Sequence, residues 1–374
     1  MNFLNLLASL FLLGTASAKA DVAAWKTRTV YQILTDRFWR SNGDTKTPCD
    51  LKKYCGGDFT GIQQKLSYIK DMGFDAIWIS PVVDNMADGY HGYWFQDWEK
   101  INSNFGTVES LKQLIDACHK MDMLVMVDVV ANHVAPVDMD FSSINPFNKP
   151  EHYHTKCDIT DWDNQYQMEY CRLLDLPDLN QTNAFVRPYL VDWIRRHTTD
   201  YDFDGIRIDT VPHVEKPFWT EYTQAGGVFS IGEVFKNNET YIADYQNYMD
   251  STLNYPMWYT IRDVWGNGQS MKQIPERWAR IKKNFKDPTV LGLFLDNHDN
   301  ARFLNSSVDM KLFKASLAFT LTGQGIPMMY YGTEQAYAGG PDPNNREPLW
   351  TNFDNKSEMY LFVKTINSAR KAQK

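Results

Sequence analysis

The stretch "DGIRIDTVPH", residues 204–213, places an arginine and an aspartate inside an otherwise apolar run. Successive side chains of a strand point to opposite faces, so Arg207 and Asp209 share one face and the two isoleucines beside them share the other. Buried strands are normally runs of Val, Ile and Leu, and burying an unpaired charge is costly. The stretch therefore indicates either an Arg–Asp pair at the solvated end of a strand or a site that needs both charges.

Similar apolar runs recur along the chain and alternate with helical stretches. The runs that we expect to be strands are residues 29–34, 75–80, 124–130, 203–209, 227–234, 290–296 and 326–332. The stretches that we expect to be helices include residues 61–73, 108–123, 183–197, 310–321 and 358–370. Such alternation indicates a parallel sheet with helices outside it, and eight units form a barrel of about 250 residues or more. We therefore predict an α/β fold, a (β/α)8 TIM barrel built from residues 21–134 and 181–374.

Residues 135–180 interrupt this alternation. They are rich in Asn, Asp and Pro and contain two of the five cysteines. We predict that they form a small inserted domain after the third strand.

The composition restricts the class of protein. The chain has 374 residues and a net charge of -8, with no basic block, which argues against nucleic-acid binding because that usually needs a positive patch. Residues 1–20 contain a short apolar run followed by small residues, which is typical of a secretory signal peptide and too short for a comfortable membrane span. We expect a secreted, soluble monomer that binds neither nucleic acid nor membrane.

Cysteines and glycosylation sequons agree with secretion. Cys49 and Cys55 form one close pair in polar sequence and Cys157 and Cys171 form another, whereas Cys118 lies in an amphipathic helical stretch. We predict a disulfide for each pair and a buried free thiol at Cys118. Sequons begin at Asn180, Asn238, Asn305 and Asn355, so we expect a glycoprotein.

Carboxylates follow several of the expected strands. They are Asp128, Asp209, Glu233, and the pair Asp296 and Asp299. The C-terminal ends of barrel strands meet at one mouth, where the active sites of such barrels lie. Any one of these acids could cap a helix or join an ion pair at the rim, but four strands that bring acids to one mouth favour catalysis.

Four stretches in this order, "DVVANH", "DGIRIDTVPH", "GEV" and "FLDNHD", resemble the conserved stretches of the α-amylase family, glycoside hydrolase family 13. A fifth is "LPDLN", residues 176–180. "YQILTDRF", "GFDAIWISPV", "YHGYW" and "DPNNREPLW" are similar to secreted fungal α-amylases in particular. The resemblance extends from about Trp25 to the end of the chain.

The resemblance implies a retaining glycoside hydrolase with three catalytic carboxylates. Asp209 would be the nucleophile, and Arg207 would keep it ionised, because a nearby opposite charge lowers the pKa of a carboxyl group. Glu233 would be the general acid and then the general base. Asp299 would bind sugar hydroxyls and favour the distorted ring.

The resemblance also implies a set of substrate-binding residues. They are Tyr93, Trp94, His133, Arg207, His298, Asp342 and Arg346. Tyr93 and Trp94 would form a stacking platform, although an aromatic pair is more often part of a core. A lone histidine is likewise more often a core residue, but His133 and His298 each lie close to an expected catalytic position.

A calcium site is implied as well. Its ligands would be Asn132, Glu169, Asp178 and the carbonyl of His213, which suits a cation that takes six to eight oxygen ligands. The ion would join the inserted segment to the barrel. In the alternative interpretation, Asn132 and Asp178 only cap loops.

Two features depart from the family pattern. Pro212 stands where many members carry a lysine that contacts sugar on the leaving-group side. The family implies a further antiparallel β domain after the barrel, and we expect the sequence up to Lys374 to lack it.

Three functions remain open at this stage. The first is endo-hydrolysis of α-1,4-glucosidic bonds in starch, glycogen or related α-glucans. The second is an α-glucanotransferase or α-glucosidase of the same superfamily, acting on polysaccharide or oligosaccharide. The third is a non-catalytic carbohydrate-binding homologue, which predicts the loss of at least one catalytic carboxylate, whereas all three are present.

Overall fold

The structure is a computed structural model and describes residues 19–373. Eight parallel strands form one sheet in the order β8-β7-β6-β5-β2-β1-β10-β9. The strands are β1 (Val30–Ile33), β2 (Ala76–Ile79), β5 (Leu124–Val129), β6 (Gly205–Ile208), β7 (Phe229–Gly232), β8 (Ser251–Thr252), β9 (Gly292–Phe294) and β10 (Ile326–Tyr330). A single bridge between Leu253 and Gly292 joins the two outer strands, so the sheet closes into the predicted (β/α)8 barrel.

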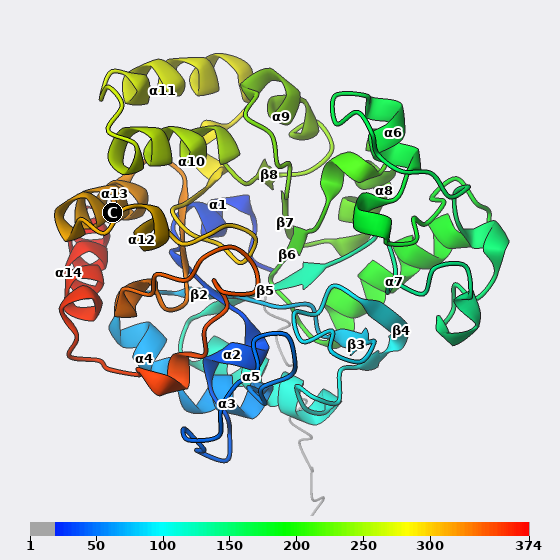
Figure 1. The fold of residues 1–374 in the computed structure, drawn as a ribbon, viewed down its shortest axis with the longest axis horizontal. Helices are drawn as coiled ribbons and strands as arrows, with labels where there is room; N and C mark the ends of the chain where they lie inside the picture. Colours follow the sequence, from blue (N-terminus) through cyan, green and yellow to red (C-terminus); the bar gives the residue numbers. More distant parts are fainter. Residues whose placement is uncertain (1–18, 374) are drawn as a thin grey trace, which may run out of the picture.

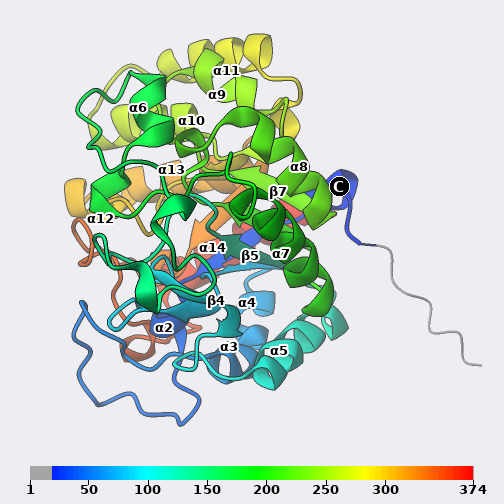
Figure 2. The same cartoon turned by 90° about the vertical axis from the view of Figure 1, so that its right-hand side faces the viewer.

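Helices surround the barrel (Figure 1). They are α1 (Val22–Lys26), α2 (Thr35–Phe38), α3 (Phe59–Gln64), α4 (Leu66–Asp71), α5 (Val108–Lys120), α6 (Gln165–Tyr170), α7 (Val186–Asp200), α8 (Lys216–Gly226), α9 (Glu239–Tyr245), α10 (Tyr255–Ile261), α11 (Gln273–Asn284), α12 (Phe303–Ser306), α13 (Met310–Thr322) and α14 (Glu358–Ala372). The side view shows α5, α7 and α8 following one another along the outer wall (Figure 2). The helices cover the outer face of the strands, and every residue of the eight strands except Leu124 is buried.

Local sequence explains where several helices begin. The side chain of Thr107 accepts a hydrogen bond from the backbone N–H of Ser110, and the side chain of Ser110 accepts one from the backbone N–H of Thr107. This reciprocal capping box starts α5. Asn254 caps α10 and is followed by a proline within the first turn, where a missing N–H costs nothing. Asp309 caps α13 in the same way.

The end of β7 is packed tightly against its surroundings. A Cβ atom at Gly232 would lie 2.3 Å from the sulfur of Met249 and 2.9 Å from Val211. Only glycine leaves room for this approach. The residue that follows, Glu233, is thereby held close to the loop after β6.

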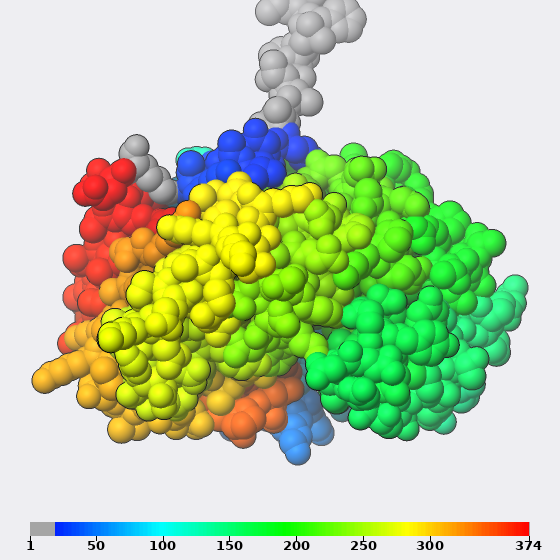
Figure 3. Space-filling model, turned by 90° about the horizontal axis from the view of Figure 1, so that it is seen from above, coloured from blue at the N-terminus to red at the C-terminus, as the bar shows by residue number. Residues whose placement is uncertain are grey.

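Residues 83–180 depart from the plain alternation twice. β3 (Val83–Asn85) and β4 (Phe95–Ile101) pair antiparallel outside the barrel, and Asp97 of β4 bridges to Asn145. Residues 135–180 hold α6 and short 3-10 turns, and they form a lobe at the opposite end of the molecule from α14 (Figure 3). The lobe returns to the barrel where His133 bridges to Asp178.

The predicted cysteine pairing is confirmed. Cys49 is bonded to Cys55, Cys157 is bonded to Cys171, and Cys118 is free and buried. The predicted signal peptide lies almost wholly outside the described residues. Among residues 19–373 there is no helix with the length and apolar character needed to cross a membrane.

Candidate active site

Arg207 of β6 lies at the centre of an acidic cluster, and its side chain is fully buried. Its Nη1 donates to Asp128 Oδ1 at 2.9 Å and to Asp209 Oδ1 at 2.8 Å. Its Nη2 lies 3.0 Å from Glu233 Oε2. Three carboxylates from the ends of three adjacent strands, β5, β6 and β7, therefore share one guanidinium group. The charged pair that interrupts the strand at residues 204–213 is both an ion pair and part of a larger cluster.

The electrostatics of Asp209 differ from the expectation. Arg207 does lower the pKa of Asp209, but burial, together with the negative charges of Glu233 and Asp128, raises this pKa well above its ordinary value. One guanidinium cannot fully neutralise three buried carboxylates. Ionisation of all three carboxyl groups at once is therefore unfavourable.

Glu233 follows β7 and is held by two donors. The backbone N–H of Thr210 donates to Oε2 at 3.2 Å, and the hydroxyl of Tyr255 donates to Oε1 at 3.3 Å. Asn297 in turn donates to the Tyr255 hydroxyl at 3.1 Å. Thr210 has a φ of 48°, a left-handed conformation that turns the chain sharply after β6 and aims its N–H at Glu233. Glu233 is thus positioned by loops from three strands.

Asp299 follows β9 and lies beside His298 and Arg346. Its Oδ1 is 3.4 Å from His298 Nε2 and 3.9 Å from Arg346 Nη2. Burial raises the pKa of Asp299, while Arg207 and Arg346 oppose that shift. In both Asp299 and Asp209, burial therefore raises the pKa and Arg207 opposes the shift.

Asp209, Glu233 and Asp299 line a cleft of about 600 Å³, whereas Arg207 and His298 are not among its lining residues. Its walls include five of the residues predicted for catalysis and sugar contact on the barrel side, Tyr93, His133, Asp209, Glu233 and Asp299, together with Asp342. Trp94 is not among the lining residues and packs edge-on against His91, with ring centroids 4.8 Å apart. Arg346 contributes by pairing with Asp342 at 2.9 Å.

Aromatic side chains frame one side of this cleft. Trp162, from the lobe, is 48% exposed, and Phe235, two residues after Glu233, is 45% exposed. Phe235 stacks on Tyr255 with ring centroids 4.5 Å apart. Lys236 donates to the carbonyl oxygen of Trp162 at 2.5 Å, so the lobe and the loop after β7 are joined at this rim. Pro212 lines the same side.

His133 lies where the cleft meets the lobe. Its Nε2 is 3.2 Å from the carbonyl oxygen of Tyr93, and its Nδ1 is 3.2 Å from Asn132 Nδ2. Burial lowers the pKa of His133 to about 4, so the ring is neutral near neutral pH. A neutral ring that donates to a carbonyl through Nε2 must accept at Nδ1.

This tautomer fixes the side chain of Asn132. Its NH2 group faces His133, so its Oδ1 faces Asp178 Oδ1 at 3.0 Å and the carbonyl oxygen of His213 at 2.8 Å. Turning the amide over would let it donate to both oxygens, but its oxygen would then need a proton on Nδ1 of His133. Three oxygens that face one another without a donor are a suitable setting for a cation.

The remaining predicted ligand lies close by. Glu169 is half-buried on α6, which packs on the 3-10 turn Val211–His213, and it accepts a hydrogen bond from Gln165. Glu215 was not predicted, and both of its carboxylate oxygens are buried without a hydrogen-bond partner. Burial and the charge of Glu215 raise the pKa of Asp178 well above its ordinary value. Among the described residues, no three His, Cys, Asp or Glu side chains form a metal cluster by themselves.

Asp296 does not reach the mouth as predicted. Its Oδ1 accepts from Arg262 at 3.0 Å and from the backbone N–H of Phe303 at 2.7 Å. Both partners lie in elements outside the barrel, so Asp296 anchors the loop after β9. Tyr255 is the main residue of the site that sequence reasoning missed, because no spacing rule marks it in the stretch "LNYPMWY", residues 253–259.

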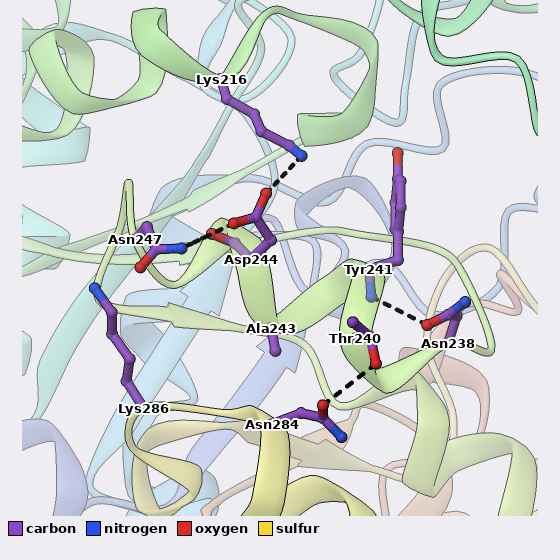
Figure 4. A pocket seen from close by; sticks show the side chains of 9 residues that line it. All are labelled: Lys216, Asn238, Thr240, Tyr241, Ala243, Asp244, Asn247, Asn284 and Lys286. Atoms are coloured by element: carbon purple, nitrogen blue, oxygen red, sulfur yellow. Dashed lines mark hydrogen bonds and ion pairs between the residues drawn. The ribbon is translucent and has the colours of Figure 1, made fainter.

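A second hollow of about 590 Å³ lies outside the barrel, between α8, α9 and the end of α11 (Figure 4). Its acid, Asp244, is paired with Lys216 at 2.7 Å. None of the carboxylates described above lines this hollow. The chemistry of the molecule is therefore concentrated in the barrel cleft.

Comparisons with known proteins agree with this geometry. The family model "Alpha amylase, catalytic domain" matches residues 32–373. An α-amylase of Saccharomycopsis fibuligera is 42% identical over 366 residues, which cover 93% of this chain and 74% of that protein. An α-amylase structure from Malbranchea cinnamomea superposes with a TM-score of 0.92 at 39% identity, covering 95% of this chain and 79% of that one.

The solved structures also include a cyclomaltodextrin glucanotransferase. It superposes with a TM-score of 0.84 at 28% identity, covering 92% of this chain and 80% of that one. The fold is therefore shared by hydrolases and transferases. The match over residues 32–373 and the identity to curated amylases show that this chain belongs to the α-amylase family, glycoside hydrolase family 13, and is a glycoside hydrolase.

Proposed function

We propose that this protein hydrolyses internal α-1,4-glucosidic bonds of starch, glycogen or related α-glucans with retention of configuration. The observation that carries the proposal is the position of Asp209 and Glu233 on neighbouring nitrogens of one guanidinium, at 2.8 and 3.0 Å. Retaining enzymes need two carboxyl groups about 5 Å apart, whereas inverting enzymes separate them by about 6.5–9.5 Å. One shared guanidinium favours the shorter separation.

In the first step, Asp209 attacks the anomeric carbon while Glu233 gives its proton to the glycosidic oxygen, and the leaving sugar departs. A covalent bond between Asp209 and the sugar replaces the glycosidic bond. In the second step, Glu233 takes a proton from water, the water oxygen bonds to the anomeric carbon, and Asp209 is released. The N–H of Thr210 and the hydroxyl of Tyr255 hold Glu233 in place through both steps.

The other residues of the cleft bind and shape the sugar. Asp299 and His298 lie side by side and are suited to the hydroxyls of the ring at the cleavage point. Tyr93 offers an aromatic face there. The pair Asp342 and Arg346 closes the far side of the cleft, and Trp94 packs against His91. Phe235 and Trp162 offer apolar faces on the leaving-group side, where Pro212 provides no charge.

Calcium fits the oxygen set beside the cleft. Asn132 Oδ1, Asp178 Oδ1 and the His213 carbonyl converge, and Glu169 and Glu215 add negative charge nearby. A hard cation takes carboxylate, amide and carbonyl oxygens of this kind. The ion would be structural, joining the lobe of residues 135–180 to the barrel as an inserted domain, and it would take no part in the chemistry.

Secretion is part of the same proposal. Two disulfides persist in oxidising compartments, and relatives of this chain include fungal α-amylases. Cleavage of residues 1–20 would release the mature enzyme, and the four sequons would then be open to glycosylation. The partner of the mature enzyme is the α-glucan itself.

Transfer to a sugar acceptor is the second candidate function, favoured by the apolar rim of Phe235 and Trp162 and by the related glucanotransferase fold. Digestion of soluble starch distinguishes the two. Hydrolysis raises the number of reducing ends in step with bond cleavage and yields mixed oligosaccharides early, whereas transfer conserves reducing ends. Release of glucose alone from chain ends would contradict the endo mode, and an unchanged polymer would contradict the proposal as a whole.

A further inference from the structure

Gln32 of β1 contacts His298 from beneath the cleft and has no place in the proposed chemistry. Its Nε2 lies 2.8 Å from Nδ1 of His298, and its side chain is buried. On the other edge of the same ring, Nε2 of His298 lies 2.5 Å from the hydroxyl of Tyr93. The two nitrogens of His298 are thus both engaged inside the protein.

Asp128, which contacts the hydroxyl of Tyr93, determines the direction of these hydrogen bonds. Asp128 accepts from Arg207 at 2.9 Å and from the indole N–H of Trp78 at 3.1 Å. The hydroxyl of Tyr93 lies 2.7 Å from Asp128 Oδ2. Burial raises the pKa of Asp128 to about 6, and Arg207, Tyr93 and Trp78 oppose that shift. Above that pH the carboxylate is ionised and can only accept, so the single hydroxyl proton of Tyr93 is donated to Asp128.

The direction then propagates back to Gln32. Because Tyr93 donates to Asp128, its oxygen must accept from His298 Nε2, which therefore carries a proton. A neutral imidazole with a proton on Nε2 has a bare Nδ1 that can only accept. The partner at 2.8 Å must be a donor, so the NH2 group of Gln32, and not its oxygen, faces His298.

Burial and the neighbouring cations keep the ring of His298 neutral. Burial is the largest cause that lowers the pKa of His298 well below its ordinary value, and the cations Arg207 and Arg346 add to it. Glu233 opposes them, Asp299 lies 3.4 Å from Nε2, and His91 is the other titratable ring nearby. A second proton on Nδ1 is therefore disfavoured.

We infer that Gln32 is a positioning residue that holds His298 as the neutral tautomer with its proton on Nε2, the nitrogen that contacts the Tyr93 hydroxyl. In that form the Nε2–H of His298 donates to the hydroxyl of Tyr93 and so holds the Tyr93 side chain, which lines the cleft. The opposite tautomer would present a bare nitrogen and would break the link to Tyr93. The catalytic consequence rests on the proposed function, whereas the tautomer itself does not.

The first test reads the tautomer directly. In protein labelled with 15N-histidine, bare and protonated imidazole nitrogens give widely separated 15N resonances, and a His298→Ala variant assigns the ring. We expect a protonated Nε2 and a bare Nδ1 in the wild type, and a shift of the Nδ1 resonance in Gln32→Met. Gln335→Met is the matched control, since Gln335 is also buried but donates to Tyr68. A wild-type ring with its proton on Nδ1 overturns the inference.

The second test is a double-mutant cycle, which asks whether Gln32 acts through His298. We expect kcat/KM of Gln32→Met to fall about tenfold or more, the scale of a buried hydrogen bond left without its partner. On a His298→Ala background the same substitution should change kcat/KM by less than about twofold. Losses that multiply independently would show that Gln32 only packs, and would overturn the inference even if the protein folds normally.

Discussion

At the scale of single residues, Glu233 should be the side chain whose loss separates binding from turnover. Glu233→Gln keeps the shape and the contact with Tyr255 but cannot deliver a proton. We expect kcat on starch to fall by about 10²–10⁴-fold, the usual contribution of general acid catalysis, with KM little changed. Near-normal turnover of the variant would contradict the role.

Asp209 makes a second prediction, because a retaining mechanism passes through a covalent intermediate. A fluorinated glycosyl donor should add the mass of the sugar to the peptide that contains Asp209, as measured by mass spectrometry. Asp209→Asn should give no labelled peptide, because the amide is a poor nucleophile. Glu239→Gln is a control, since Glu239 is paired with Arg277 and Arg280 outside the cleft. Label on another carboxylate would show that the nucleophile is assigned wrongly.

That Asp209, Glu233 and Asp299 meet at one cleft could be predicted from sequence because each follows a recognisable strand, and barrel strands end at one mouth. Asp296 also follows a strand but does not reach the mouth, because its Oδ1 accepts hydrogen bonds from Arg262 and from the backbone N–H of Phe303. The roles of Tyr255 and Gln32 depend on which atoms meet across the barrel. No spacing along the chain carries that information.

At the scale of elements, α7 makes the stability of the protein depend on pH. His197 is buried in α7 and stacks on Trp193 with ring centroids 4.5 Å apart. Burial lowers the pKa of His197 to about 3, whereas an unfolded chain has a histidine pKa of about 6.5. As pH falls from about 6.5 towards 3, the unfolded state gains a proton that the folded state refuses, so stability is lost over that range.

Replacing this ring should remove part of that dependence. We expect His197→Phe to flatten the curve of unfolding free energy against pH, with a relative gain of about 3 kcal/mol at pH 4 compared with pH 7. Urea unfolding at several pH values measures the slope, and a change in the baseline stability of the variant does not affect the comparison. Parallel curves for wild type and variant would show that His197 titrates normally.

Seven of the eight barrel strands could be predicted because each is an apolar run bounded by polar residues. β8 was missed because it has only two residues, Ser251 and Thr252, with no apolar pattern. The lobe of residues 135–180 was recognisable only as an interruption, since its short turns and α6 follow no period. Its disulfide, in contrast, could be predicted from the closeness of Cys157 and Cys171 in the sequence.

At the scale of the whole molecule, calcium should hold the lobe against the barrel. An ion bound only by the folded state adds about 2.7 kcal/mol at a hundredfold excess over Kd. A chelator should therefore lower the melting temperature, and Asp178→Ala should lower it and abolish the effect of the chelator. Asp158→Ala is a suitable control, because Asp158 is an exposed acid of the same lobe. A metal assay that finds no calcium in the purified protein would exclude the site.

The closure of the barrel has a consequence for how the molecule moves. Neighbouring strands elsewhere are joined along their length, but β8 and β9 meet through the one bridge between Leu253 and Gly292. Segments with few hydrogen bonds open most readily, so deuterium should enter the backbone of residues 251–255 and 290–294 before that of β5 and β6. Tyr255, which holds Glu233, begins α10 two residues beyond this seam. Gentle heating should therefore inactivate the enzyme reversibly while most of its secondary structure persists. The barrel should open first between β8 and β9, next to Tyr255, the residue that positions Glu233.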